Sequence, residues 1–95
     1  MAQVVLMPTA ESNVEQIFEY FASSSVQRSA HKITELTNKL SILEHAPLLG
    51  RPLPTGQREL LIGDRRHTYA VRYQYDQARD TVFVLSIRSS SQNVS

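Results

Sequence analysis

Residues 68–88, TYAVRYQYDQARDTVFVLSIR, contain two runs of β-branched and aromatic side chains separated by a polar segment. The runs, Thr68 to Tyr75 and Thr81 to Arg88, have the alternation that is typical of strands. Residues 76–80 are polar and few, so they predict a hairpin turn. Strands joined by so short a connection are antiparallel neighbours. This hairpin decides the fold, because the rest of the chain must cover one of its faces.

The two faces of the predicted hairpin differ in polarity. In the second strand one set of alternate residues is more apolar than the other, and we expect that set to lie under a second layer. The hairpin residues expected in the core are Val71, Tyr73, Phe83, Leu85 and Ile87. By the same alternation, Arg72 and Arg88 share the opposite, uncovered face of the sheet.

Two amphipathic helices are predicted upstream of the hairpin. Apolar residues recur at helical spacing from Ala10 to Phe21 and again from Val26 to Leu43. These patterns predict helices over roughly residues 10–23 and 26–45. The serines at positions 23–25 make a short link, so the two helices should form an antiparallel helical hairpin.

The remaining segments complete an α+β fold. Gln3 to Met7 and Arg58 to Ile62 are predicted strands, and the proline-rich residues 46–56 are a predicted loop. The order is therefore β-α-α-β-β-β, a two-layer fold with the helical hairpin packed on one face of an antiparallel sheet. The neighbour of the first strand is left open by the sequence. We expect a single domain over residues 1–88 and a polar, flexible tail over residues 89–95.

Composition limits the classes of function. The chain has 95 residues and no cysteine, which suits one small domain and excludes a disulfide framework and thiolate metal sites. Its apolar runs are far shorter than the about 20 residues that a membrane span needs. The three histidines lack metal-ligand spacing and the three glycines form no phosphate-binding loop. We therefore expect a cytoplasmic protein with no metal, no cofactor and no membrane contact.

Charge is distributed unevenly along the chain. Residues 1–46 carry three Lys or Arg against five Asp or Glu, whereas residues 47–95 carry seven against four, so the halves have net charges of −2 and +3. All seven basic residues of the second half are arginine, which forms planar, bidentate contacts with carboxylates and phosphates. An acidic partner for the second half is the expectation that follows.

The candidate partner-binding residues are arginines of the predicted sheet. Arg72 and Arg88 are the main candidates because alternation places them on the uncovered face, and Arg58 is expected beside them. Arg65, Arg66 and His67 are weaker candidates from the turn before the hairpin. No side-chain set in the sequence indicates a catalytic site.

Taken together, the sequence resembles the RelE/ParE superfamily of bacterial toxins, and the resemblance covers nearly the whole chain. The segments that carry it, in order, are Pro8-Thr9-Ala10-Glu11, Ile17-Phe18-Glu19-Tyr20-Phe21, Leu43-Glu44-His45-Ala46-Pro47, Gly50-Arg51, Arg58-Glu59-Leu60, Tyr69-Ala70-Val71-Arg72-Tyr73 and the last strand, Val82 to Arg88. The chain is more similar to the ParE branch, through Gly50-Arg51, Arg58-Glu59-Leu60 and the Tyr-x-Val-x-Tyr strand.

The resemblance implies a toxin of a type II toxin–antitoxin, or plasmid stabilisation, system that forms a hetero-oligomer with a cognate antitoxin. A ParE-like toxin would be a non-enzymatic inhibitor of DNA gyrase, whereas a RelE-like toxin would cleave messenger RNA in the ribosome. Both branches usually carry basic residues, histidine or tyrosine near the C-terminus, where this chain has Ser89-Ser90-Ser91-Gln92. A degenerate, non-toxic relative that acts only as a binding module is therefore the third possibility.

Overall fold

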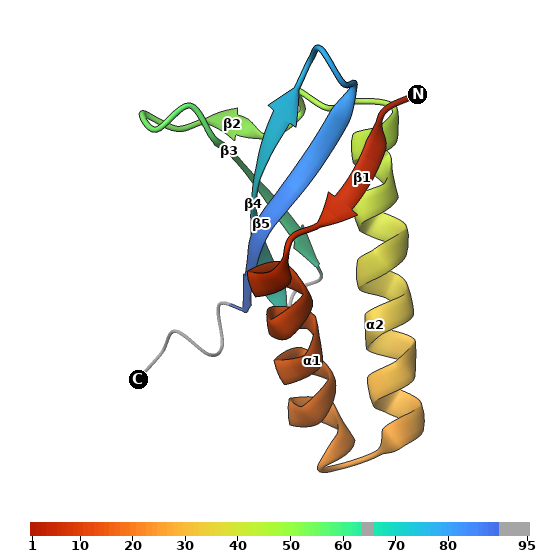
Figure 1. Ribbon diagram of the computed structural model, residues 1–95. Coiled ribbons are helices and arrows are strands. Elements are labelled where there is room, and N and C mark those ends of the chain that lie inside the picture. The colour runs from red at the N-terminus through yellow and green to blue at the C-terminus, as the bar shows by residue number, and fades with distance from the viewer. Residues whose placement is uncertain (64–65, 90–95) are drawn as a thin grey trace.

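The computed structural model describes residues 1–63 and 66–89, which form two helices against a five-stranded sheet (Figure 1). The elements in chain order are β1 (Gln3–Leu6), α1 (Pro8–Ala22), α2 (Val26–Leu40), the 3₁₀ helix η1 (Ser41–Glu44), β2 (Arg51–Pro52), β3 (Arg58–Gly63), β4 (Thr68–Asp76) and β5 (Thr81–Ser89). This order confirms the predicted α+β fold, to which the two-residue strand β2 adds one element.

The sheet has the strand order β1-β5-β4-β3-β2 and is mixed. Strands β3, β4 and β5 form antiparallel pairs, as predicted, and β2, which was expected to be loop, adds a further antiparallel pair. Strand β1 pairs in parallel with β5, so the sheet is not antiparallel throughout, as had been expected. Parallel neighbours need a long crossover, and here the helical hairpin and three strands separate β1 from β5 along the chain. Alternation within single strands carries no information about such a distant pairing, so the place of β1 could not be deduced.

The helix boundaries follow local chemistry. Helix α1 begins at Pro8, whose fixed backbone angle and missing N–H suit the first helical position, and it therefore starts two residues earlier than predicted. Helix α2 is capped by Ser25, whose hydroxyl accepts a hydrogen bond from the Arg28 N–H. The α-helix ends at Leu40 rather than near residue 45, because the chain tightens there into η1.

The largest correction concerns which face of β5 is buried. Val82 and Val84 are fully buried against the helices, while Phe83 and Leu85, which were expected there, are only half-buried on the other face. The cause is a β-bulge: Tyr73 pairs with Val84, but the preceding Arg72 pairs with Ser86. The extra residue reverses the alternation in mid-strand, so that Ile87 returns to the core as predicted. A bulge of this kind has no signature in the residue pattern.

The bulge predicts losses of stability of different size for two neighbouring substitutions. Val84→Ala should lower the free energy of unfolding by about 2 kcal/mol, because Val84 is fully buried. Leu85→Ala removes a larger side chain but should cost less than about 1 kcal/mol, because Leu85 is half-buried outside the core. Urea unfolding of both variants measures the difference. A larger cost for Leu85→Ala would mean that the alternation continues unbroken along β5.

The last strand extends one residue beyond the predicted domain boundary at residue 88. Ser89, which was expected in the tail, is the last residue of β5, and the other tail residues, 90–95, lie outside the described part of the chain. None of the helices in the described residues is long and apolar enough to cross a bilayer.

Candidate partner-binding face

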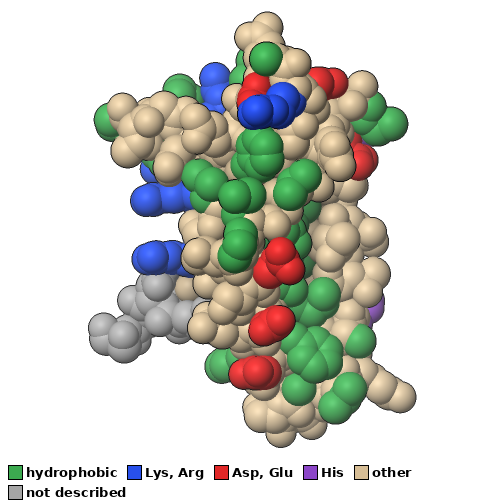
Figure 2. All heavy atoms as spheres, in the orientation of Figure 1, with side chains coloured by type: hydrophobic (Ala, Val, Ile, Leu, Met, Phe, Trp, Pro, Cys, Tyr) green, Lys and Arg blue, Asp and Glu red, His purple; other side chains and the backbone are tan. Residues whose placement is uncertain are grey.

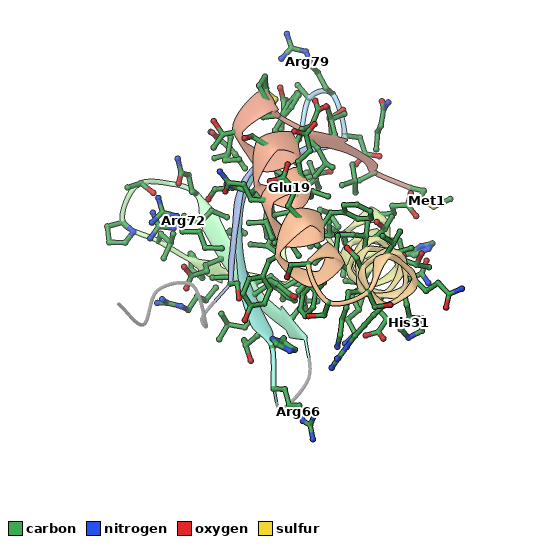
Figure 3. All side chains as sticks on the ribbon, turned by 90° about the horizontal axis from the view of Figure 1, so that it is seen from below. Met1, Glu19, His31, Arg66, Arg72 and Arg79 are labelled. Carbon is green, nitrogen blue, oxygen red and sulfur yellow. The ribbon has the colours of Figure 1, made fainter. Side chains whose placement is uncertain are left out.

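One face of the sheet is free of helices, and we call it the open face. Helices α1 and α2 lie together on the opposite side, and Figure 3 shows Arg72 pointing away from both of them. Residues that pair directly across strands share a face. Arg51, Glu59 and Arg72 pair in one such row, from β2 across β3 to β4.

Glu59 lies between two arginines of the open face. One carboxylate oxygen accepts a hydrogen bond from the Arg51 guanidinium at 3.0 Å, and the other lies 3.6 Å from Arg72 Nε. The Glu59 side chain is only 14% exposed, whereas Arg51 and Arg72 are 71% and 54% exposed. Glu59 therefore orients both arginines, while leaving most of each guanidinium accessible to a partner.

Arg88 adds positive charge to the same face. It pairs with Ala70 and so is a diagonal neighbour of Arg72, at a distance of about 7–8 Å between backbones. Arg88 is exposed and makes no ion pair within residues 1–63 and 66–89. With three arginines around one glutamate, this part of the open face carries an excess of two positive charges, which favours an anionic partner.

The other half of the open face is apolar. Val5 of β1 pairs with Phe83 of β5, and both are half-buried, as is the bulged Leu85. Figure 2 shows apolar side chains gathered over β1 and β5, with basic side chains at the edge of the same view. A surface that is apolar on one side and cationic on the other fits a protein partner with both apolar and acidic side chains.

Arg58 does not lie beside Arg72 and Arg88, as the sequence had suggested. It shares the helix side of β3 with Leu60 and Ile62, both of which pack against the core. One nitrogen of its guanidinium donates to the carbonyls of Leu48 and Gly50, at 3.1 and 2.8 Å. These hydrogen bonds fix the loop before β2, so Arg58 has a structural role.

The same loop is fixed from β4. The Gly50 N–H donates to the hydroxyl of the fully buried Tyr73 at 2.8 Å. A Cβ atom on Gly50 would lie 2.8 Å from the Tyr73 ring and 3.0 Å from the Glu59 carbonyl, so only glycine fits. Arg58, Tyr73 and Gly50 thus place β2, and with it Arg51, at the edge of the sheet.

Neither His67 nor Arg66, the two weaker candidates that the structure describes, lies on the open face (Figure 3). His67 is half-buried and packs edge-to-face on Phe21 of α1, with ring centres 5.0 Å apart, which places it on the helix side. Arg66 is exposed, and Figure 3 shows it far from Arg72. Arg65 lies outside the described residues.

Two pKa shifts belong to the turn between β4 and β5. A hydrogen bond from the Tyr75 hydroxyl to Asp80 raises the pKa of Tyr75, and the Arg79 backbone N–H lowers the pKa of Asp76. Asp80 has a positive φ of 47°, which aspartate tolerates better than most residues. These contacts stabilise the turn between β4 and β5.

Sequence alternation correctly placed Arg72 and Arg88 on the uncovered face of the sheet, but it did not place Arg51 and Glu59 there. Glu59 precedes Leu60 in the same strand, and neighbouring strand residues point to opposite faces of the sheet. Assigning Leu60 to the core would therefore have placed Glu59 on the open face. Arg51 had no such signal, because its strand has two residues and lies within a proline-rich segment.

Comparisons with known proteins agree with this fold. Residues 4–94 match the family model described as ParE toxin of type II toxin-antitoxin system, parDE. Among solved structures, a chain of the chromosomal ParDE toxin–antitoxin system from P. aeruginosa is 14% identical with a TM-score of 0.74, covering 92% of this chain and 94% of that one. A chain of the toxin–antitoxin complex RelBE2 from Mycobacterium tuberculosis is 20% identical with a TM-score of 0.60, covering 90% and 94%. At these identities the two structures establish a shared fold. No curated protein matches the sequence.

Proposed function

Because the chain belongs to the ParE toxin family of type II toxin–antitoxin systems, we propose that it poisons DNA gyrase and that a cognate antitoxin neutralises it. The observation that carries this proposal is the match of the family model over residues 4–94, which includes every strand of the sheet except the first residue of β1. The toxin class follows from the family. The gyrase target and the neutralising partner are the proposed part.

The open face supports binding rather than hydrolysis as the mode of action. Cleavage of RNA needs groups that take up and release protons close to the phosphate, and arginine cannot act as a general base because it stays protonated. The one carboxylate that we assign to this face, that of Glu59, is only 14% exposed and is held between Arg51 and Arg72. His67, the histidine nearest to the arginines in sequence, packs against Phe21 on the other side of the sheet. An inhibitor that binds a large protein needs no proton transfer, so this arrangement favours the gyrase target over the ribosomal one.

The antitoxin is proposed to bind the open face. Both structural neighbours come from toxin–antitoxin assemblies, which supports a protein partner for this chain. The excess positive charge around Arg72 and Arg88 favours acidic side chains on that partner, and the patch of Val5, Phe83 and Leu85 favours apolar ones. The expected assembly is a hetero-oligomer of toxin and antitoxin.

Induction of the protein in a bacterial host tests the target. We expect growth arrest with filamentation and induction of the SOS response, because a poisoned gyrase leaves broken DNA. Co-expression of the small gene adjacent to the coding sequence should restore growth. The readouts are an SOS reporter, cell length and pulse labelling of protein synthesis, with soluble expression verified in each culture.

Two other outcomes would contradict the proposal. Rapid translation arrest with cleaved messages, and no SOS response, would assign the protein to the ribosome-dependent nucleases. Normal growth at verified soluble expression would identify a non-toxic binding module, the alternative that the serine-rich segment Ser89-Ser90-Ser91-Gln92 leaves open.

A further inference from the structure

A groove lies between the end of the helix layer and the outer edge of β3. Strand β2 pairs with β3 only at Arg58 and Glu59, so residues 60–63 have no strand on their outer side within the described part of the chain. The groove that opens there has a volume of about 650 Å³. Its lining comes from the end of α2 and from η1 on one side, from β3 on the other, and from Leu49 in the loop before β2. Figure 1 shows this loop crossing from the helix layer to β2 at one end of the sheet.

Exposed apolar side chains gather in this groove. Seven large hydrophobic residues are exposed in the described part of the chain, and three of them, Ile42, Leu49 and Leu61, line the groove. Their exposed fractions are 47%, 50% and 63%. Leu60 and Ile62 complete the apolar lining from β3. Apolar side chains that are concentrated in one concave place indicate a binding surface.

The charged side chains of the groove are basic. Lys39 and His45 belong to its described lining, which contains no Asp or Glu. Lys39 Nζ donates a hydrogen bond to the Gly63 carbonyl at 3.1 Å, so part of the open strand edge is already occupied. A lysine at the edge of a sheet opposes pairing with a further strand. An apolar floor beside positive charge therefore fits an amphipathic helix with acidic residues along its flank.

The same charges disfavour a second copy of this chain as the occupant. In a symmetric dimer the same patch of both copies would meet at the two-fold axis. Lys39 and His45 of one copy would then face Lys39 and His45 of the other, and like charges that face each other across an interface are costly. The occupant is therefore expected to be a different protein.

The groove is continuous with the open face. Leu61 lies two residues from Glu59 on β3, so both side chains project on the same side of the sheet. At the other rim of the groove, Leu49 comes two residues before Arg51, whose guanidinium contacts Glu59. A large protein bound across Arg51 and Glu59 would therefore reach over the rim of the groove.

We propose that this groove docks an acidic amphipathic helix of the toxin's target, and that an antitoxin on the open face excludes this helix by covering the shared rim. The inference rests on the proposed function, because it takes DNA gyrase to be the target. Apolar side chains three or four residues apart on the helix enter between Ile42, Leu49 and Leu61. Acidic side chains on its flank face Lys39 and His45. The groove and the arginines of the open face thus have different partners.

Two glutamate substitutions test the groove. Ile42→Glu and Leu49→Glu each replace an apolar contact by a carboxylate that repels an acidic helix, and both side chains are half exposed, so the fold should tolerate the change. Val26→Glu is the matched control, because Val26 is 64% exposed at the start of α2, whereas the groove lies at the end of that helix. Ile42→Ala and Leu49→Ala repeat the test without adding charge. Thermal unfolding verifies that each variant is folded.

The probe is purified DNA gyrase holoenzyme, titrated onto the immobilised full chain. We expect both glutamate variants to weaken binding of gyrase about tenfold or more, while Val26→Glu binds as the wild type does. Affinity for the product of the adjacent small gene should change by less than about threefold, because Ile42 and Leu49 lie outside the arginine cluster of the open face. Wild-type chain saturated with that gene product should not bind gyrase.

Each contrary result has its own meaning. Unchanged gyrase affinity in both glutamate variants would overturn the groove inference and leave the proposed target in place. If the wild-type chain does not bind gyrase, the proposed target and the groove inference are both overturned. An equal loss for Val26→Glu would show that only net charge matters, and a larger loss for the adjacent gene product than for gyrase would assign the groove to the antitoxin. Either of these results overturns the inference, and binding of gyrase by the saturated complex would overturn the proposed exclusion.

Discussion

Arg88→Ala is expected to weaken binding of the antitoxin roughly 10- to 150-fold, the equivalent of about 1.5–3 kcal/mol for one charge-assisted hydrogen bond. Arg88 is exposed on the open face and makes no ion pair within the described residues, so its guanidinium is available to a partner. Its removal should change the free energy of unfolding by less than about 0.5 kcal/mol. Isothermal titration calorimetry and thermal unfolding measure the two effects separately.

Arg72→Ala should weaken binding by a similar factor but with a measurable cost in stability. The Arg72 Nε lies 3.6 Å from the Glu59 carboxylate, which would be left with Arg51 alone. Arg28→Ala is the matched control, because Arg28 is an exposed arginine near the start of α2, away from the open face. Unchanged affinity in both the Arg72 and Arg88 variants would remove the open face from the antitoxin site. A loss of the same size for Arg28→Ala would indicate that only net charge matters.

Salt dependence gives a further readout of the same contacts. Exposed charge pairs are screened at high ionic strength, with a Debye length of about 8 Å at 0.15 M. The wild-type affinity should therefore fall as salt is added, and the fall should be shallower for Arg88→Ala. A structural role for the arginine would not change this slope.

Alternation predicted these two arginines for reasons that the structure makes clear. Each lies next to a fully buried residue of its own strand, Arg72 beside Val71 and Arg88 beside Ile87, and that local relation survives the bulge. Leu85 is the extra residue of the bulge and Phe83 lies beyond it, so the same rule assigned both to the wrong face. A pattern with a period of two is reliable only as far as the strand remains regular.

The sequence pattern could not predict contacts between segments that are distant along the chain. Arg58 was expected on the open face because its alternation partners, Leu60 and Ile62, were not firmly assigned to the core. Its actual partners are backbone carbonyls in a loop with no regular structure of its own. Hydrogen bonds to backbone carbonyls do not depend on the identity of the residues that provide them, so they leave no trace in the sequence.

Gly50→Ala is expected to lower the free energy of unfolding by about 3 kcal/mol. The added methyl group would meet the Tyr73 ring and hydroxyl at 2.8 Å, and Tyr73 cannot move because it is fully buried. Any shift of the loop that relieves this contact would stretch the bonds from Gly50 to Tyr73 and from Arg58 to Gly50. For a domain of this size the melting temperature should fall by on the order of 15 °C, as measured by circular dichroism.

The control for this substitution is a second glycine, in the turn between β2 and β3. Gly56 has a positive φ of 88°, and a Cβ atom at this position would meet nothing within 4 Å, so its constraint is conformational rather than steric. Gly56→Asn should therefore cost well under about 1 kcal/mol, since asparagine tolerates the left-handed region. A small cost in the free energy of unfolding for Gly50→Ala would mean that the loop can shift without losing its hydrogen bonds to Tyr73 and Arg58. In that case the position of Arg51, and with it the arrangement of Glu59 and Arg72, would not depend on the contacts of Tyr73 and Arg58.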